Sequence, residues 1–174
     1  MIQISGSTQR SFLFPASLSQ AFAYYSDIPR SLTFLPHISL VRRFAPGQYR
    51  LLYSALESGL YRVKIFCDVL TILDANEHFI RIQPCQENSP IKSEAGLYSM
   101  TGQGAFDSQI VFSAAGDQTS IEFSISIGAR LPVPLTLRLV PMALLSGSAQ
   151  RKLSLHTDEI VNRFIERSIR SFTL

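Results

Sequence analysis

The sequence predicts an α+β fold: a curved antiparallel sheet of about seven strands wrapped on one long C-terminal helix, with two short helices after the first strand. Two observations carry this prediction. Apolar and polar residues alternate through most of the chain, which is typical of strands with one buried face. Helical spacing occurs only in residues 17–36 and 141–172. A sheet with one apolar face needs a cover, and one amphipathic helix is the simplest.

Composition favours one globular domain over residues 1–174, because 46% of the side chains are hydrophobic and 17% are charged. The net charge of +3 is spread along the chain, so nucleic acid is a poor candidate partner. The first ten residues, MIQISGSTQR, lack the features of a signal peptide, and no apolar stretch reaches the roughly 18 residues that span a bilayer. We therefore expect a soluble, cytoplasmic protein.

The two cysteines, Cys67 and Cys85, are too few for a disulfide framework and lack the spacing of metal ligands. A tight turn at residues 74–77 is expected to join the strands that contain them, with Val69 opposite Ile82. In that register the two thiols point to opposite faces of the sheet. We expect no disulfide, no metal site and no cofactor.

Two hairpins can be placed from alternation. Residues 116–117, Gly-Asp, suit a two-residue turn. The expected pairs are Phe112 with Ile121, Ile110 with Phe123 and Phe106 with Ile127. Residues 58–59, Ser-Gly, are expected to turn a second hairpin, with Leu52 opposite Ile65.

The first helical region is expected to be a bent pair of short helices. Ser17 with Gln20 forms a capping-box pattern that starts the first helix. Asp27 can cap a second start, and Pro29 is tolerated only in a first turn. Pro36 keeps the preceding residue out of the helical region, so the second helix has to end before it.

The second helical region is one amphipathic helix that starts at Pro141. We expect about six to eight turns, weakened at Gly147. Its apolar stripe consists of Leu153, His156, Ile160, Val161, Phe164, Ile165, Ile169 and Phe172.

The element order and the stretch ASLSQAFAYYSDIPRSLTFLPHISLVRRFAPGQYR, residues 16–50, resemble the helix-grip (SRPBCC) superfamily. That superfamily includes START lipid-transfer domains, the major birch-pollen allergen, polyketide cyclases and coenzyme Q-binding proteins. Residues 131–141, LPVPLTLRLVP, are similar to an uncharacterised cyanobacterial and plastid branch. The resemblance implies a helix-grip fold whose cavity, between the curved sheet and the long helix, holds an apolar or amphipathic ligand.

The side chains expected to line that cavity follow from the alternation. The sheet would contribute Val63, Ile65, Val69, Ile80, Ile82, Phe112, Ile121, Phe123 and Ile125, and the helix Leu153, Ile160 and Phe164. The alternative is that the same side chains fill a solid core, because ligand pockets and cores have similar apolar compositions.

Three polar residues are candidates for contact with a ligand. His78 and His156 share apolar faces, where either could orient a ligand carbonyl or act as a base, or be a structural or rim histidine. Arg10 is in phase with Phe12 and Phe14, so an inward guanidinium could pair with a carboxylate or phosphate; a break near the start of the strand would turn it outward.

Two surfaces are candidates for contact with a partner. Basic residues on neighbouring strands could meet phosphate or an anionic membrane, or form a solvated strand face. They are Arg42, Arg43, Arg50, Arg62 and Lys64. Residues 131–145 are apolar apart from Arg138, and could be a lip at the cavity mouth, a membrane-touching edge, a partner site or a buried segment.

Three functions follow from these observations. The first is binding or carrying of a lipid, isoprenoid, quinone or pigment-like molecule, stabilised by apolar burial. The second is a cyclase-like or hydrolase-like enzyme in the same cavity, although the chain has no Gly-rich phosphate loop, HExxH or GxSxG. Its candidate groups are His78, His156, Tyr24, Tyr25 and Tyr98. The third is an interaction or assembly protein with a filled core, which contacts a protein or peripheral membrane surface.

Overall fold

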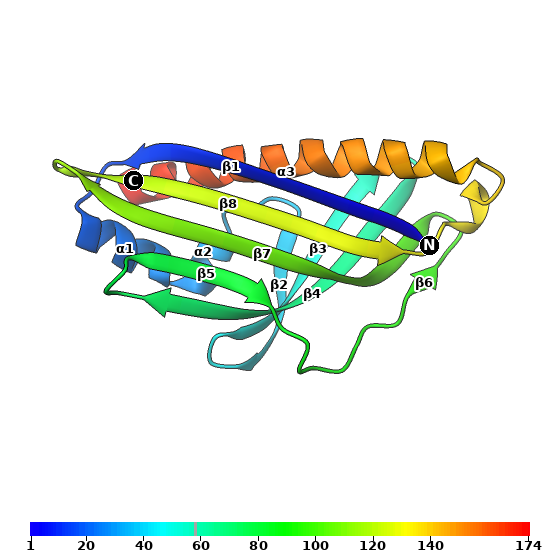
Figure 1. The fold of residues 1–174 in the computed structure, drawn as a ribbon, viewed down its shortest axis with the longest axis horizontal. Helices are drawn as coiled ribbons and strands as arrows, with labels where there is room; N and C mark the ends of the chain where they lie inside the picture. The colour runs from blue at the N-terminus through cyan, green and yellow to red at the C-terminus, as the bar shows by residue number, and fades with distance from the viewer. Residues whose placement is uncertain (58) are drawn as a thin grey trace.

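The computed structural model describes residues 1–57 and 59–174. In these residues an eight-stranded sheet has the order β1-β8-β7-β5-β4-β3-β2, and the short strand β6 pairs with β7 (Figure 1). The strands are β1 (Ile2–Phe14), β2 (Ile38–Ala45), β3 (Gln48–Glu57), β4 (Tyr61–Asp74), β5 (Phe79–Pro84), β6 (Glu94–Ala95), β7 (Ser99–Ala115) and β8 (Gln118–Leu131). The helices are α1 (Leu18–Ser26), α2 (Ile28–Leu32), the 3-10 turn η1 (Leu135–Leu137) and α3 (Met142–Thr173).

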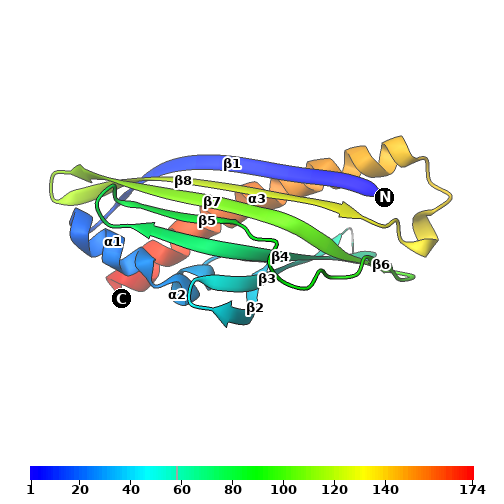
Figure 2. The same ribbon diagram turned by 60° about the horizontal axis from the view of Figure 1, so that its bottom comes forward.

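The layers agree with the fold class predicted from the sequence. The long helix α3 runs along one side of the sheet next to β1, and α1 and α2 lie near its C-terminal end (Figures 1 and 2). Every strand pair in the sheet is antiparallel except β4 with β7, which pair in parallel over five residue pairs from Arg62 and Ser99. The buried side chains of the sheet and α3 form one core.

The starts of the helices follow the capping signals in the sequence. The backbone N–H of Ser17 donates to the side chain of Gln20 at 3.3 Å, and Asp27 accepts from the N–H of Arg30 at 3.3 Å. Helix α3 begins directly after Pro141 and continues without interruption past Gly147. Its 32 residues make about nine turns, slightly more than expected.

The hairpin of β7 and β8 has the predicted register. Phe112 pairs with Ile121, and Phe106 pairs with Ile127, across a turn in which Gly116 has φ of 69°. That positive φ is readily adopted by glycine.

The β4–β5 register was predicted wrongly by two residues. Val69 pairs with Pro84, because the four-residue turn lies one residue later than expected, between the paired Asp74 and Phe79. The Asp74 carboxylate accepts from the N–H groups of Asn76 and Glu77 at 3.0 and 2.9 Å. A shift of two residues leaves every side chain on its predicted face. The cysteines Cys67 and Cys85 are free, as predicted.

The β3–β4 register was predicted wrongly by one residue, and this error has larger consequences. Glu57 pairs with Tyr61, and Tyr53 rather than Leu52 lies opposite Ile65. The part of the prediction that concerns Ser58 lies outside the described residues. A shift of one residue exchanges the two faces of a strand, so Tyr53 and Glu57 point into the protein.

The anchorage of α3 is uneven along its length. Its buried residues are Leu153, Thr157, Ile160, Val161, Phe164 and Ser168. Residues 142–152 include no buried side chain. Where burial starts, α3 packs closely on β1: a Cβ built on Gly6 would lie 3.0 Å from the carbonyl oxygen of Leu153. In the part of the chain that the structure describes, no helix is both long and apolar enough to cross a membrane.

A pair of glycine substitutions tests the packing of the sheet. A Cβ on Gly104 would collide with the carbonyl oxygen of Gly128 and lie 2.5 Å from Ile65 Cγ2. We expect Gly104→Ala to lower the free energy of unfolding by about 2 kcal/mol. Gly147→Ala, in open space on α3, should raise it by roughly 0.5 kcal/mol. Urea unfolding measures both; equal stability of the two variants would contradict this packing.

Candidate functional site

Two small pockets lie between the sheet and the helices. The first, here called the proximal pocket because it lies under the start of α3, is lined by Ile2, Ile4, Tyr53, Glu57, Tyr61, Val63, Met100, Leu131, Ala149 and Leu153. The second, the distal pocket, is lined by Tyr25, Ile28, Ser31, Leu32, Leu35, Ile80, Ile82, Ser108, Ile110, Phe123 and Phe164. Each has a volume of about 20 Å³, which is about enough for one water molecule.

All twelve apolar residues predicted to line a cavity are buried. Val63 and Leu153 line the proximal pocket. The distal pocket is lined by four of the others, Ile80, Ile82, Phe123 and Phe164. The other six belong to the surrounding core and line neither pocket: Ile65, Val69, Phe112, Ile121, Ile125 and Ile160.

The three predicted polar contacts lie in different surroundings. The guanidinium of Arg10 is exposed and lies 3.3 Å from Asp158 of α3, outside both pockets. His78 is in the β4–β5 turn, where its ring packs edge-on against Phe22 at 5.9 Å. Only His156 lies beside a pocket, because its ring contacts Tyr53.

His156 belongs to a polar cluster at the wall of the proximal pocket. The phenol oxygen of Tyr53 is 2.6 Å from His156 Nδ1, and Glu57 Oε1 is 3.4 Å from the same nitrogen. The other oxygen of Glu57 is 3.7 Å from Lys152 Nζ. Tyr53 and Glu57 are both buried on β3, whereas His156 and Lys152 are half-buried on α3. The cluster therefore joins the sheet to the helix.

A second histidine, His37, extends the cluster toward solvent. Its ring stacks on that of His156, with centroids 5.0 Å apart and an interplanar angle of 18°. Its Nε2 is 3.1 Å from Glu159 Oε2. The backbone of His37 has φ of 63°, and its carbonyl accepts from the N–H of Ser54 at 2.8 Å. This contact holds the residue next to β3.

The surroundings keep the phenol of Tyr53 protonated. Burial raises the pKa of Tyr53, and the negative charges of Glu57 and Glu159 raise it further. A neutral imidazole that accepts from this phenol at Nδ1 carries its own proton on Nε2. In the imidazolium form, Nδ1–H faces both the Tyr53 oxygen and Glu57. The cluster can thus offer a donor, an acceptor or an exchangeable proton to a group in the pocket.

Within the predicted group of basic residues, Arg50 has its partners inside the protein. Arg50 makes a bidentate ion pair with the buried Asp68, at 2.6 and 2.7 Å, and also donates to the carbonyl of Ser89 at 2.8 Å. Its role is structural. Arg42 is exposed on β2 with its guanidinium over Phe44, and Arg62 donates to Ser54 at 3.3 Å. In residues 1–57 and 59–174, no group of three or more His, Cys, Asp or Glu could hold a metal ion.

The chain was compared with known proteins by sequence and by structure. No protein-family model and no curated protein matches the sequence. A crystal structure of a protein from Deinococcus radiodurans is 11% identical over 91% of this chain and 93% of that one, with a TM-score of 0.54. A START superfamily protein from Mycobacterium smegmatis is 13% identical over 95% of this chain and 98% of that one, with a TM-score of 0.50.

A further similar structure is the di-domain ARO/CYC StfQ from the steffimycin biosynthetic pathway, which is 8% identical, with a TM-score of 0.55. The match covers 96% of this chain and 50% of StfQ. These likenesses show that the chain has the helix-grip fold found in START-like proteins and aromatase/cyclases. They do not bear on the cyanobacterial and plastid branch, which stays a prediction.

The buried phenol of Tyr53 makes stability depend on alkaline pH. Above pH 10 the unfolded chain loses this proton while the folded chain keeps it, so stability falls as pH rises. We expect Tyr53→Phe to reduce the slope of the free energy of unfolding against pH, above pH 10, by about 1.4 kcal/mol per pH unit. Urea unfolding between pH 9 and pH 11 measures the slope. The control is Tyr98→Phe at an exposed site; if both variants keep the wild-type slope, Tyr53 is not buried as described.

Proposed function

We propose that the protein binds and carries an apolar or amphipathic small molecule, such as a lipid, isoprenoid, quinone or pigment-like compound, between the sheet and α3. The observation that carries this proposal is the proximal pocket: a mostly apolar space under the helix with a polar cluster at its wall. Ligand pockets typically combine an apolar lining with a few polar groups that fix orientation. The helix-grip fold shared with a START superfamily protein supports the same function.

The polar cluster favours a ligand with one oxygen-bearing end. The phenol of Tyr53 can donate its one proton to a ligand carbonyl or carboxylate in place of His156 Nδ1, and Glu57 can accept from a hydroxyl group. The rest of the lining is aliphatic or aromatic and suits a chain or ring system. An isoprenoid alcohol, a fatty acid or a quinone has this division into a polar end and an apolar body.

Binding requires the space to enlarge, because about 20 Å³ is far smaller than such a molecule. The first third of α3 is the part that can move. Residues 142–152 have no fully buried side chain, and Leu145 and Ala149 are only partly buried against the core. Their polar contacts with the sheet include Gln150 with the backbone of Ser5 and Lys152 with Glu57. The exposed contact of Gln150 adds little stability. The Glu57 carboxylate is buried, so the loss of its contact with Lys152 costs more. Burial of the ligand, at about 25 cal/mol per Å² of apolar surface, can offset their loss.

Native mass spectrometry, followed by extraction and identification of any released molecule, tests the proposal directly. We expect a bound apolar compound, or stoichiometric uptake of a fluorescent fatty-acid or quinone probe by the extracted protein. Ala149→Trp should weaken uptake more than tenfold, because the indole fills the proximal pocket. Leu155→Trp, on the exposed face of the same helix, is the matched control. An empty protein that takes up no probe would instead support the interaction protein with a filled core.

The short contact between Tyr53 and His156 favours a second candidate, a cyclase-like or hydrolase-like enzyme in the same pocket. A histidine within 2.6 Å of a phenol can relay a proton to or from a bound substrate. The similarity in fold to the ARO/CYC StfQ supports this candidate as well. The other proposed catalytic groups are less suitable: Tyr24 and Tyr25 contact Ser168, and Tyr98 is exposed.

The two candidates differ in what happens to the bound molecule. For a carrier, the extracted compound stays unchanged when it is returned to the protein, and His156→Phe alters only its affinity. For an enzyme, mass spectrometry detects a product, and His156→Phe lowers the rate at least a hundredfold while probe binding remains. His78→Phe, in the distant turn, is the matched control. Product formation that is insensitive to both substitutions would exclude the proposed role of His156.

A further inference from the structure

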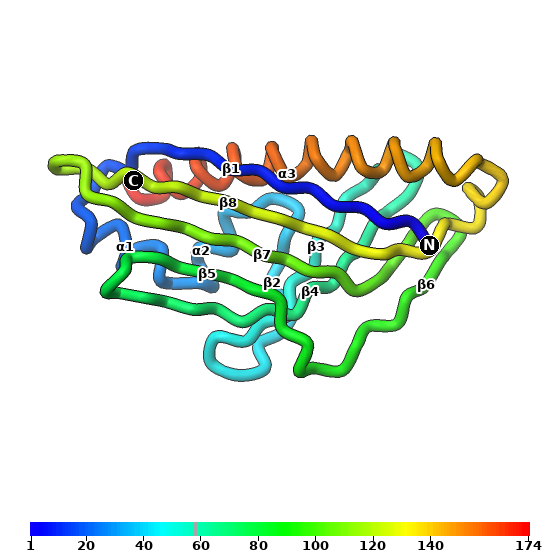
Figure 3. Tube along the Cα trace, in the orientation of Figure 1, coloured from blue at the N-terminus to red at the C-terminus, as the bar shows by residue number. Residues whose placement is uncertain are grey.

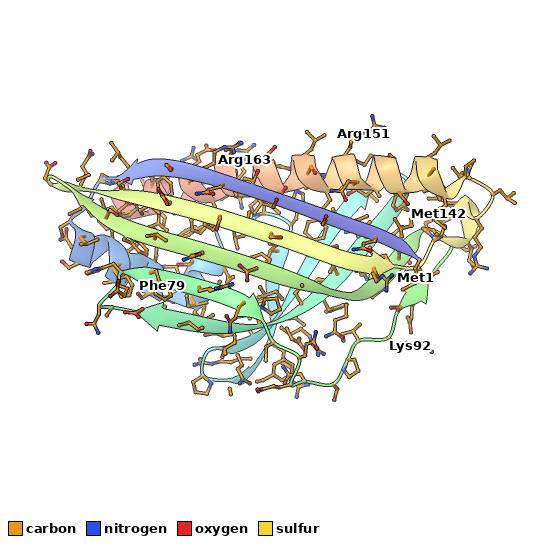
Figure 4. The ribbon with its side chains drawn as sticks, in the orientation of Figure 1. Met1, Phe79, Lys92, Met142, Arg151 and Arg163 are labelled. Carbon is orange, nitrogen blue, oxygen red and sulfur yellow. The ribbon has the colours of Figure 1, made fainter. Side chains whose placement is uncertain are left out.

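Large apolar side chains are exposed together at the end of the molecule where α3 begins. We call this surface the apolar tip. It consists of Leu60, Leu97, Tyr98, Leu135, Leu139, Met142 and Leu144. The side chain of Leu139 is 98% exposed and that of Leu144 is 66% exposed. Figure 4 shows Met1 and Met142 at this end.

The apolar tip is built from three chain segments that hydrogen bonds hold together. The start of β4 meets the β6–β7 connection where Arg62 N–H donates to the carbonyl of Tyr98 at 2.8 Å. The β6–β7 connection meets η1 where Leu135 N–H donates to Gly96 at 3.1 Å and the Thr136 hydroxyl donates to Leu97 at 2.8 Å. Figure 3 shows β6 and the connection before α3 converging at this end. These bonds bring the three segments together at one end of the molecule.

An open groove adjoins the apolar tip. It has a volume of about 310 Å³ and is lined by Met1, Pro132, Val133, Arg138, Val140, Met142 and Leu145. Apart from Arg138, these residues are apolar. Leu131 and Ala149 line the proximal pocket, whereas Val133 and Leu145 line the groove. The same two segments, the end of β8 and the start of α3, thus border both spaces.

The charges around the apolar tip are mostly positive. Arg62, Arg130 and Arg138 are exposed on or beside its three segments. Residues 123–157 contain two further basic residues, Arg151 and Lys152, and no Asp or Glu. Glu94 is the exposed acidic residue on β6. An apolar surface with a basic border matches an anionic partner that is apolar beneath its charged layer.

We propose that the apolar tip docks on the surface of an anionic lipid bilayer. Leu139, Leu144 and their neighbours insert at the level of the lipid headgroups, and Arg62, Arg130 and Arg138 contact the negative headgroups. Side chains that project from three connections are suited to a deformable lipid surface. Docking in this way leaves the strands and the buried part of α3 unchanged. This proposal does not depend on the identity or presence of an internal ligand.

Vesicle flotation tests the proposal, with phosphatidylcholine vesicles and with vesicles of phosphatidylcholine mixed with phosphatidylserine. We expect the protein to float with the mixed vesicles and to be released by high salt. Leu139→Ser with Leu144→Ser should lower the partition coefficient at least tenfold. Arg130→Glu with Arg138→Glu should lower it at least twentyfold, from roughly fivefold for each arginine.

Two variants outside the apolar tip provide controls with matched chemistry. Leu155→Ser changes an equally exposed leucine of α3, and Arg167→Glu reverses an exposed charge near its other end. Both should float like the unchanged protein. Absence of flotation with the mixed vesicles overturns the proposal. If gel filtration then shows a dimer that the tip variants abolish, the apolar tip joins two copies of the chain instead. Equal losses in the tip variants and the controls overturn it too.

Probe uptake in detergent-free buffer separates this proposal from the carrier function. We expect the tip variants to bind the fluorescent fatty-acid or quinone probe as tightly as the unchanged protein, because none of the four substituted residues lines the proximal pocket. Ala149→Trp should show the reverse pattern, with normal flotation and weakened uptake. If the tip variants and Ala149→Trp lose both properties together, membrane docking is not a separate function of the tip.

Discussion

The structure depends on one constraint: a single helix has to cover the apolar face of the sheet. Helix α3 meets this constraint over its last two thirds, where Leu153, Ile160 and Phe164 are buried against the strands. Gly6 permits the close contact with Leu153 that marks where the burial starts. The first third of α3 extends beyond that contact. The proximal pocket and the apolar tip both lie at this less firmly held end.

The opposite end of α3 is fixed by aromatic packing and buried hydrogen bonds. The Tyr25 hydroxyl lies 2.7 Å from Ser168 Oγ, and Tyr24 donates to the backbone of the same serine. The ring of Phe14 lies 4.7 Å from that of Phe172. Because these contacts are buried and specific, the C-terminal end of the helix is the firmer one. An opening movement of the first third can therefore leave most of the core intact.

Alternation predicted most of the fold and only part of the candidate site. The β7–β8 register was predicted correctly because large apolar residues pair with each other across a two-residue turn: Phe112 with Ile121, Ile110 with Phe123 and Phe106 with Ile127. Between β3 and β4 the alternation fits either of two registers, and the one chosen turned Tyr53 and Glu57 outward. His156 was identified from the stripe of α3. His37 had no periodic signal, since its position follows from a left-handed backbone and a contact with β3.

The polar cluster spans the boundary between the two parts of α3. In this position it would couple the proposed opening of the proximal pocket to the binding of a ligand. Lys152 is the last residue of the part without buried side chains, whereas His156 lies in the buried part. If the first third lifts as proposed for ligand entry, Lys152 would move away from Glu57 while His156 and Tyr53 would stay in contact. A buried carboxylate that loses one of its cations gains from a new donor. A hydroxyl group of an entering ligand can supply that donor, so the movement that opens the pocket also creates its polar binding group.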